Sequence, residues 1–190
     1  DLESLPRLIT AYQGVDVLRL GELWAIPIML RLAMIENLRR VGTRIAKGMT
    51  ERTEAAHWAD QMMTVAQADP KGLVLVVADM ARSEPSMAPS FVAELVRRLR
   101  GQSAALTMPL NWLELRLTES GQSTEQVVQE DIQQQAASQL SISNSIGGLR
   151  ALGATDWRDF VEAMSTVEHQ LREDPGGVYA HMAVSYTHLT

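Results

Sequence analysis

The feature that most constrains the fold of this chain is the spacing of its apolar residues, which recur every three or four positions through most of the sequence. This is the period of an amphipathic α-helix, whereas a half-buried strand alternates with a period of two. The longest such run covers residues 21–47, where one helix face holds Leu23, Leu30, Met34, Leu38, Val41 and Ile45. The sequence therefore predicts an all-α chain, an irregular bundle of about seven or eight helices in one compact domain.

Glycine, proline and capping residues divide this pattern into segments. Gly48 is predicted to end the helix at 21–47, and Gly147–Gly148 to mark a kink or a close helix contact. Residues 73–77 also fit a short buried strand, but no partner strand is visible, so a helix is predicted there. Four further helices are predicted at 5–12, from Thr50 or Thr53 to 68, from Ser86 or Ser90 to 99, and at 109–118. A polar helix is predicted from Ser123, with Val127, Val128, Ile132, Ala136 and Leu140 at helical spacing. The last predicted helix covers 157–171, is capped by Asp156 and contains a Glu168–Arg172 pair.

The most apolar stretch, "GELWAIPIMLRLAMIENLRR" at residues 21–40, is predicted to be a core helix. A membrane span needs about 20 mostly apolar residues, whereas the longest uncharged run here is residues 23–30. We therefore expect no membrane span within this chain. Pro27 is expected to bend the helix or to mark its start. A buried guanidinium is costly unless it is paired, so Arg31 is expected to bind a carboxylate of another helix, with Glu22, Glu36 and Glu162 as candidates.

Composition narrows the function classes. The net charge of −6 and the pI near 5.2 argue against a nucleic-acid partner, because such proteins usually carry a basic surface. The chain has no cysteine, which excludes disulfides and thiolate metal sites. It begins with Asp and not with Met, so we expect an excerpt or a processed product. Its N-terminus lacks the basic-then-apolar layout of a signal peptide.

No motif in the sequence specifies a catalytic site. Gly-x-Ser-x-Gly, His-Glu-x-x-His, the phosphate loop and Asp-x-Asp are all absent. His57, His169 and His181 share no ligand spacing, so no metal site is expected. The stretch "SISNSIGGLR" at residues 141–150 allows two interpretations, a helix end that contacts sugar or phosphate and close helix packing. Trp24 and Trp157 likewise fit either the floor of a sugar site or the core, which is the commoner role.

Two long stretches resemble a known family. "GELWAIPIMLRLAMIENLRR" and "SISNSIGGLRALGATDWRDFVEAMSTVEHQLREDPGGVYAHM" are similar to the N-terminal region of bacterial cyclic β-1,2-glucan synthases, and the resemblance covers about residues 5–182. It implies a helical region on the cytoplasmic side of the inner membrane, followed by membrane helices and catalytic domains. The full synthases use UDP-glucose and a divalent cation, while no catalytic residue and no cofactor is implied for this segment. Residues 183–190, "AVSYTHLT", do not match and are expected to form a foreign or disordered tail.

The resemblance implies a non-catalytic segment that supports glucan polymerisation by packing against the remaining domains of the same synthase. The alternative is a module that binds carbohydrate or nucleotide sugar and orients the growing β-1,2-glucan. The candidate binding residues for that alternative are Trp24, Arg31, Asn144, Arg150 and Trp157.

Overall fold

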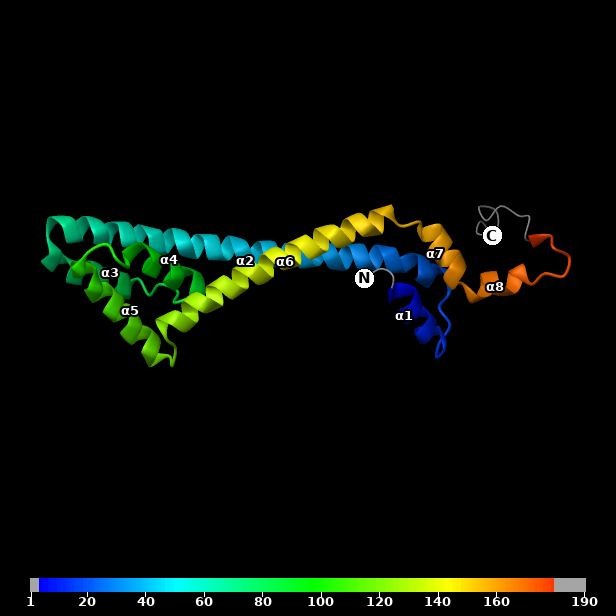
Figure 1. Ribbon diagram of the computed structural model, residues 1–190, viewed down its shortest axis with the longest axis horizontal. Coiled ribbons are helices and arrows are strands. Elements are labelled where there is room, and N and C mark those ends of the chain that lie inside the picture. Colours follow the sequence, from blue (N-terminus) through cyan, green and yellow to red (C-terminus); the bar gives the residue numbers. More distant parts are fainter. Residues whose placement is uncertain (1–3, 180–190) are drawn as a thin grey trace. The chain divides into compact units, whose positions relative to one another are not determined.

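The computed structural model describes residues 4–179, and in that part of the chain it contains eight α-helices and no strand (Figure 1). The predicted all-α class and helix count are confirmed, and residues 73–77 belong to a helix. The α-helices are α1 (Ser4–Gln13), α2 (Leu20–Ala68), α3 (Leu73–Arg82), α4 (Pro89–Leu99), α5 (Thr107–Glu119), α6 (Thr124–Ala154), α7 (Trp157–Met164) and α8 (Thr166–Arg172), with short 3-10 turns η1 (Pro70–Gly72) and η2 (Ala104–Leu106). None of the described helices combines the length and apolar character that a bilayer span requires.

The chain separates into two compact units. The inner unit is Asn37–Ser143, and the terminal unit takes in the residues up to Glu36 and from Asn144 onward. Both α2 and α6 contribute to each unit, because the divisions fall inside these two helices. The predicted boundary between residues 182 and 183 lies outside the described residues and stays a prediction.

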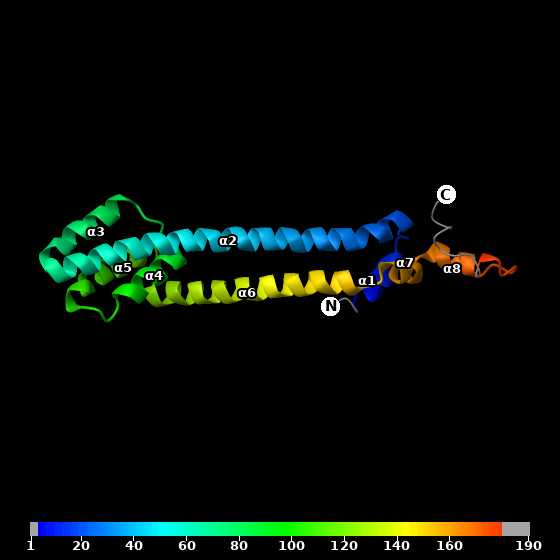
Figure 2. The ribbon, with the colours of Figure 1, turned by 90° about the horizontal axis from the view of Figure 1, so that it is seen from above.

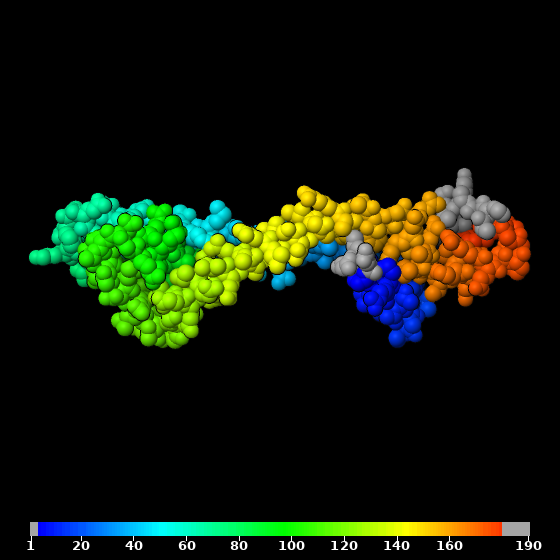
Figure 3. All heavy atoms as spheres, in the orientation of Figure 1, coloured from blue at the N-terminus to red at the C-terminus, as the bar shows by residue number. Residues whose placement is uncertain are grey.

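The inner unit is built around a continuous apolar core. Side chains of α2, α3, α4 and α5 meet there and exclude water, and the space-filling view shows these helices as one continuous mass (Figure 3). Among the fully buried side chains are Met62, Phe91, Leu95 and Leu113. Burial of such side chains is the main favourable contribution to folding.

The terminal unit has a smaller core, in which the buried apolar side chains of its cluster are Ile9, Leu23 and Val161. Asp156 caps α7 as predicted, since its carboxylate accepts hydrogen bonds from the backbone N–H groups of Arg158 and Asp159. The prediction of one helix over 157–171 is wrong. The backbone is extended at Ser165, and the Ser165 hydroxyl caps α8 by accepting from the Glu168 N–H. A Ser followed three residues later by Glu is a helix-start signal, and here it interrupts an otherwise helical pattern.

Gly48 does not end a helix, which is a second correction. α2 continues through it, and a Cβ at this position would lie 3.0 Å from Ser90 Oγ. The glycine therefore permits a close approach of α4 instead of terminating α2. Thr50 and Thr53 do not start a helix either, because both lie inside α2. Their hydroxyls bind the carbonyls of the preceding turn. α2 is also continuous through the buried Pro27.

The start of α4 also differs from the prediction. Its N-cap is Ala88, with no side-chain cap, and Pro89 occupies the first turn. Neither Ser86 nor Ser90 caps the helix; Ser90 lies in the first turn and directs its hydroxyl to Asp131 instead. The predicted start of a helix near Ser123 is confirmed, and Ser123 caps α6, since its hydroxyl accepts from the Gln126 N–H while its own N–H donates to the Gln126 side chain.

The buried face of α6 is polar. Ile132 and Leu140, expected on its apolar stripe, are 54% and 63% exposed. The buried line instead advances seven residues at a time and consists of Thr124, Asp131, Ser138, Ser145 and Leu152. The same interval holds along α2, where Met34 is half-buried and Pro27, Val41, Gly48, Ala55 and Met62 are buried. A seven-residue repeat is the signature of a coiled-coil seam.

In the inner unit, α2 and α6 lie side by side and run antiparallel (Figure 2). Asn37 Nδ2 donates to Ser141 Oγ over 2.9 Å, and Arg52 Nη2 donates to Asp131 Oδ1 over 2.7 Å. Higher numbers on α2 thus pair with lower numbers on α6, so these polar contacts join the two helices along the seam.

Candidate functional site

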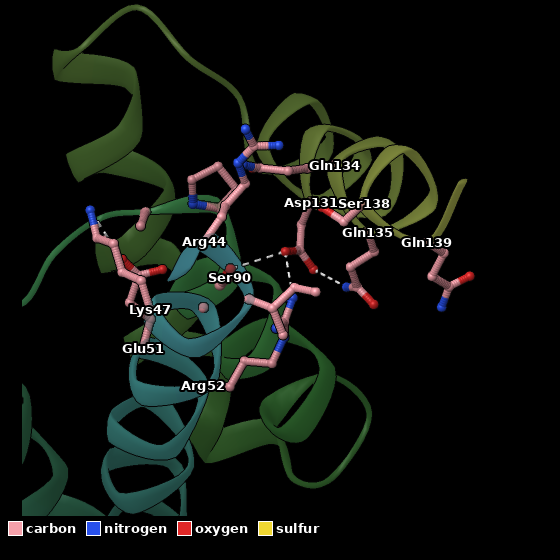
Figure 4. Close-up of a pocket in the computed structure, with 14 residues that line it drawn as sticks. Arg44, Lys47, Glu51, Arg52, Ser90, Asp131, Gln134, Gln135, Ser138 and Gln139 are labelled. Atoms are coloured by element: carbon pink, nitrogen blue, oxygen red, sulfur yellow. Dashed lines mark hydrogen bonds and ion pairs between the residues drawn. The ribbon is translucent and has the colours of Figure 1, made fainter. Parts of the chain in front are cut away.

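A polar cleft opens in the inner unit where the middle of α2, the start of α4 and the first half of α6 meet (Figure 4). Its volume is about 350 Å³, which falls within the range of small-molecule sites. Its lining comprises Arg44, Ile45, Lys47, Gly48, Glu51 and Arg52 of α2, Ala88, Pro89 and Ser90 around the start of α4, and Asp131, Gln134, Gln135, Ser138 and Gln139 of α6. We call this group of residues the polar cleft.

Asp131 is the central anion of the cleft. It is only 5% exposed, and Oδ1 accepts from Arg52 Nη2 at 2.7 Å and from Ser90 Oγ at 3.2 Å. Oδ2 accepts from Gln135 Nε2 at 2.6 Å, and Figure 4 shows all three donors directed at the carboxylate. Because a buried charge is tolerated only when it is paired and hydrogen-bonded, we infer that these contacts fix Asp131 in place.

The local sequence explains why the three helices meet there. Gly48 has no side chain, so Ser90 and Arg52 approach the α2 backbone closely. Ala88 offers no side-chain cap for α4, and Ser90 in the first turn links this helix start to Asp131. Negative charge near a helix N-terminus is stabilising, so the buried carboxylate also favours the α4 start.

Glu51 is the second carboxylate of the cleft. It is 9% exposed, and its Oε1 accepts no hydrogen bond within residues 4–179. The Lys47 ammonium lies 3.8 Å from this atom, which supplies charge but not a hydrogen bond of ordinary length. The cleft wall therefore contains an acceptor that lacks a donor.

The remaining groups of the cleft are donors and mixed donor–acceptors. Lys47 and Arg52 face Glu51 and Asp131, whereas Arg44 is exposed and makes no ion pair within the described part of the chain. The glutamine amides both donate and accept hydrogen bonds. This arrangement suits binding, because the central carboxylate is already occupied by three donors.

The five binding residues predicted from the sequence lie in the terminal unit, and none lines the polar cleft. The fold brings two of them together, since the Leu152 carbonyl accepts from Trp157 Nε1 at 2.7 Å and from Arg31 Nη2 at 3.3 Å. Trp157 is buried edge-on against Phe160. Trp24, Asn144 and Arg150 are exposed. The binding role of the five residues stays a prediction.

The prediction that Arg31 binds a carboxylate of another helix is wrong. Among the ion pairs of residues 4–179 none involves Arg31, and Glu162 pairs with Arg158 and Arg172 instead. Glu22 accepts from the Arg19 N–H. Because the Arg31 side chain is only half-buried, a single backbone carbonyl and contact with solvent satisfy its guanidinium.

The "SISNSIGGLR" stretch takes part in close helix packing. A Cβ at Gly148 would lie 2.6 Å from Met34 Cε, whereas one at Gly147 would meet nothing within 4 Å. The close-contact alternative is therefore confirmed for Gly148, and the helix continues through both glycines. At its other end, the Ser141 hydroxyl accepts from Asn37. Small side chains at these positions let α6 approach α2 within each unit.

A polar cluster in the terminal unit surrounds the buried Glu168. Its Oε1 accepts from Arg172 Nε at 3.1 Å, which confirms the predicted pair, and its Oε2 accepts from the Tyr179 hydroxyl at 2.5 Å. In the following turn, backbone hydrogen bonds from Gly176, Tyr179 and Val178 hold the pKa of Asp174 below its usual value. Within residues 4–179 no cluster of three or more His, Asp or Glu side chains is placed to hold a metal ion, and His181 lies outside them.

Two signals in the sequence could have pointed to the cleft. A glycine inside a strong helical pattern often has a packing reason, and Gly48 has one. Polar residues that recur every seventh position, such as Thr124, Asp131, Ser138 and Ser145, indicate a polar seam. The apolar residues of the same helix obscured this second signal.

No protein-family model matches the sequence. Over 179 residues, or 94% of this chain, the sequence is 32% identical to the cyclic β-(1,2)-glucan synthase NdvB of Rhizobium meliloti strain 1021. The matched part is only 6% of that protein's length. The resemblance found in the sequence is thereby confirmed: this chain is homologous to a segment of the cyclic β-(1,2)-glucan synthase NdvB.

Proposed function

We propose that this chain is a non-catalytic helical segment of a cyclic β-(1,2)-glucan synthase, and that it supports UDP-glucose-dependent glucan polymerisation on the cytoplasmic side of the inner membrane. The homology supports this proposal, because it extends over 94% of the chain but only 6% of the relative. A segment of this kind has a large remaining polypeptide against which to pack.

The observation that carries the proposal is an exposed apolar stripe on α2 in the terminal unit. Ile28, Leu32 and Ile35 are 56%, 54% and 55% exposed, and their spacing puts them on one helix face. Exposed apolar residues that gather on one surface mark interaction sites, whereas single ones are ordinary. We call Ile28, Leu32 and Ile35 the α2 stripe.

The proposed occupant of the α2 stripe is an apolar surface of the same synthase polypeptide outside this segment. Covering the exposed half of each of these side chains stabilises a complex by about 1 kcal/mol. The relative's length outside the match, 94% of that protein, supplies the polypeptide that such a contact needs.

The experiment is to replace Ile28, Leu32 and Ile35 together by serine in a synthase that carries this segment. We expect the yield of assembled enzyme and of glucan to fall, while the 190-residue chain alone stays folded with a modestly lower melting temperature, because more than half of each side chain is already exposed. Val74 and Leu75, exposed apolar residues of α3, replaced by serine serve as the matched control. Normal assembly and full glucan production by the triple variant would refute the proposal.

A second candidate function is a carbohydrate-binding module that orients the growing glucan. The polar cleft favours it, because amides, hydroxyls and carboxylates line a cavity of about 350 Å³. These are the groups that fix the orientation of a polar ligand in a small-molecule site.

A further inference from the structure

We infer that the polar cleft of the inner unit binds a neutral, polyhydroxylated ligand of the glucose-oligomer class. The inference rests on the second candidate function and deepens it, since it assigns the site, the ligand's charge and the residues that contact it. These residues differ from the five predicted from the sequence.

The charges of the cleft favour a neutral ligand. Arg52 is paired with Asp131 and Lys47 with Glu51, which leaves Arg44 as the lining cation without an ion pair in the described part of the chain. Because each carboxylate of the wall has a cationic partner, the net charge of the lining is that of Arg44, whose exposure to solvent weakens its attraction for an anion. The start of α4, a natural site for an anion, already has Asp131 beside its first turn.

The hydrogen-bonding groups of the cleft match hydroxyls. Glu51 Oε1 lacks a donor among residues 4–179, and a ligand hydroxyl supplies one after a small rotation of the carboxylate, whose terminal torsion is soft. Arg44 and Gln134 donate to hydroxyl oxygens, and Ser138 presents a buried hydroxyl from the opposite helix. Hydroxyl groups both donate and accept, so a single sugar ring can satisfy partners of both kinds.

The walls of the cleft determine how tightly it binds a ligand and how large that ligand can be. Its walls are largely α-helices, which hold side chains more precisely than loops do. No aromatic ring lines it, so affinity comes from hydrogen bonds and not from stacking. A cavity of about 350 Å³ admits a short stretch of an oligosaccharide and not a long one.

The test is to titrate the 190-residue chain with linear β-1,2-linked glucose oligomers, with heat and backbone amide shifts as readouts. We expect saturable binding with shifts at residues 44–52 and 131–139. Arg44→Ala and Gln134→Ala should each weaken binding by about tenfold, the effect of losing one hydrogen bond to a ligand. Arg40→Ala and Gln133→Ala are the matched controls, because both residues are exposed on the same helices and neither lines the cleft.

Three results would overturn the inference. The first is a titration with neither heat nor amide shifts. The second is equal weakening of oligomer binding by the cleft variants and the control variants. The third is saturable binding of inorganic phosphate or UDP that displaces the oligomer, which would identify an anion site. The proposed scaffolding role is read separately, through assembly of the synthase with a substituted α2 stripe. If Gln134→Ala loses oligomer binding while the synthase assembles normally, the result supports ligand binding in the polar cleft and leaves the scaffolding proposal unaffected.

Discussion

The inner and terminal units share α2 and α6 but differ in what fills their interiors. In the inner unit a cluster of 15 buried apolar residues extends over α2, α3, α4, α5, η2 and α6. In the terminal unit the corresponding cluster has three buried residues, and several partly buried ones pack around them. The same pair of helices is thus well covered where α3, α4 and α5 pack on it, and exposes the α2 stripe where they do not.

The two units also accommodate an arginine of α2 in different ways. In the inner unit Arg52 is bound to a nearly inaccessible carboxylate, Asp131. In the terminal unit Arg31 donates to the Leu152 carbonyl and stays half-exposed. Both arginines are partly buried, so the difference lies in the partner: the buried Asp131 carboxylate requires a counter-charge, whereas the Leu152 carbonyl does not.

The largest expected difference concerns the two phenylalanines of the chain, one in each unit. Phe91→Ala removes a fully buried ring from the inner core and should cost about 3–5 kcal/mol of unfolding free energy. Phe160→Ala removes a partly buried ring of the terminal unit and should cost about 1–2 kcal/mol. Denaturant unfolding measures both values, and equal costs would contradict the contrast between the two cores.

The next comparison applies one substitution to both arginines. Arg52→Met strands the buried Asp131 carboxylate with Ser90 and Gln135 as its remaining donors, and should cost about 2–4 kcal/mol. Arg31→Met leaves the Leu152 carbonyl bound to Trp157, so its cost should stay below about 1 kcal/mol. The double variant Arg52→Met, Asp131→Leu should recover part of the loss. A large loss of unfolding free energy in Arg31→Met would instead support the internal ion pair expected from the sequence.

A smaller effect is expected at the two glycines of the helix contacts. Gly48→Ala puts a methyl group 3.0 Å from Ser90 Oγ and 3.3 Å from Arg52 Nη1, which disturbs the contacts of Asp131, and should cost about 1 kcal/mol despite the higher helix propensity of Ala. Gly148→Ala meets only the flexible end of Met34 and should change stability by less than about 0.5 kcal/mol. Segment-resolved hydrogen exchange distinguishes the two, and the reverse order would show that the Met34 contact is the more rigid one.

The smallest effect is a dependence on pH. Hydrogen bonds from Arg97, opposed by partial burial and reinforced by Arg98, lower the pKa of Glu94 in the inner unit. Because the folded pKa lies below the unfolded one, this stabilisation is complete above the ordinary glutamate pKa of about 4.3 and is lost as the pH falls through the folded pKa.

Glu94→Gln should therefore flatten the acid limb of the stability curve of the inner unit. In the terminal unit Asp174→Asn should act in the same direction, because backbone N–H groups, that of Gly176 foremost, lower the pKa of Asp174. Titration of the side-chain carboxyl signals by NMR measures both pKa values directly. A folded pKa at or above the ordinary value would contradict the assignment.

Much of the fold could be predicted from local sequence signals. The cap at Asp156, the start of a helix near Ser123 and the Glu168–Arg172 pair each depend on groups within four residues of one another, and the sequence predicts all three. The break at Ser165 used an equally local signal, but the continuous apolar spacing on both sides outweighed it in the interpretation.

The polar cleft could not be predicted in the same way. Arg52 and Asp131 are 79 positions apart, and Ser90 and Asp131 are 41 apart. Neither the periodicity nor the capping rules relate residues at such distances. The apolar side chains of Ile132 and Leu140 predicted the opposite face of α6 as the buried one, whereas both are exposed.

The sequence by itself determined that this protein is helical, where most of its helices begin and end, and which relative it resembles, because helix propensity, capping and homology are written in the local order of residues. Only the tertiary structure decided that Gly48 is a point of helix contact, that the seam of α6 is polar, and that Asp131 gathers Arg52, Ser90 and Gln135 around a cleft. These features depend on which side chains, distant in the sequence, pack together and exclude water. Such burial arises only when several helices pack, so no single helix sequence specifies it.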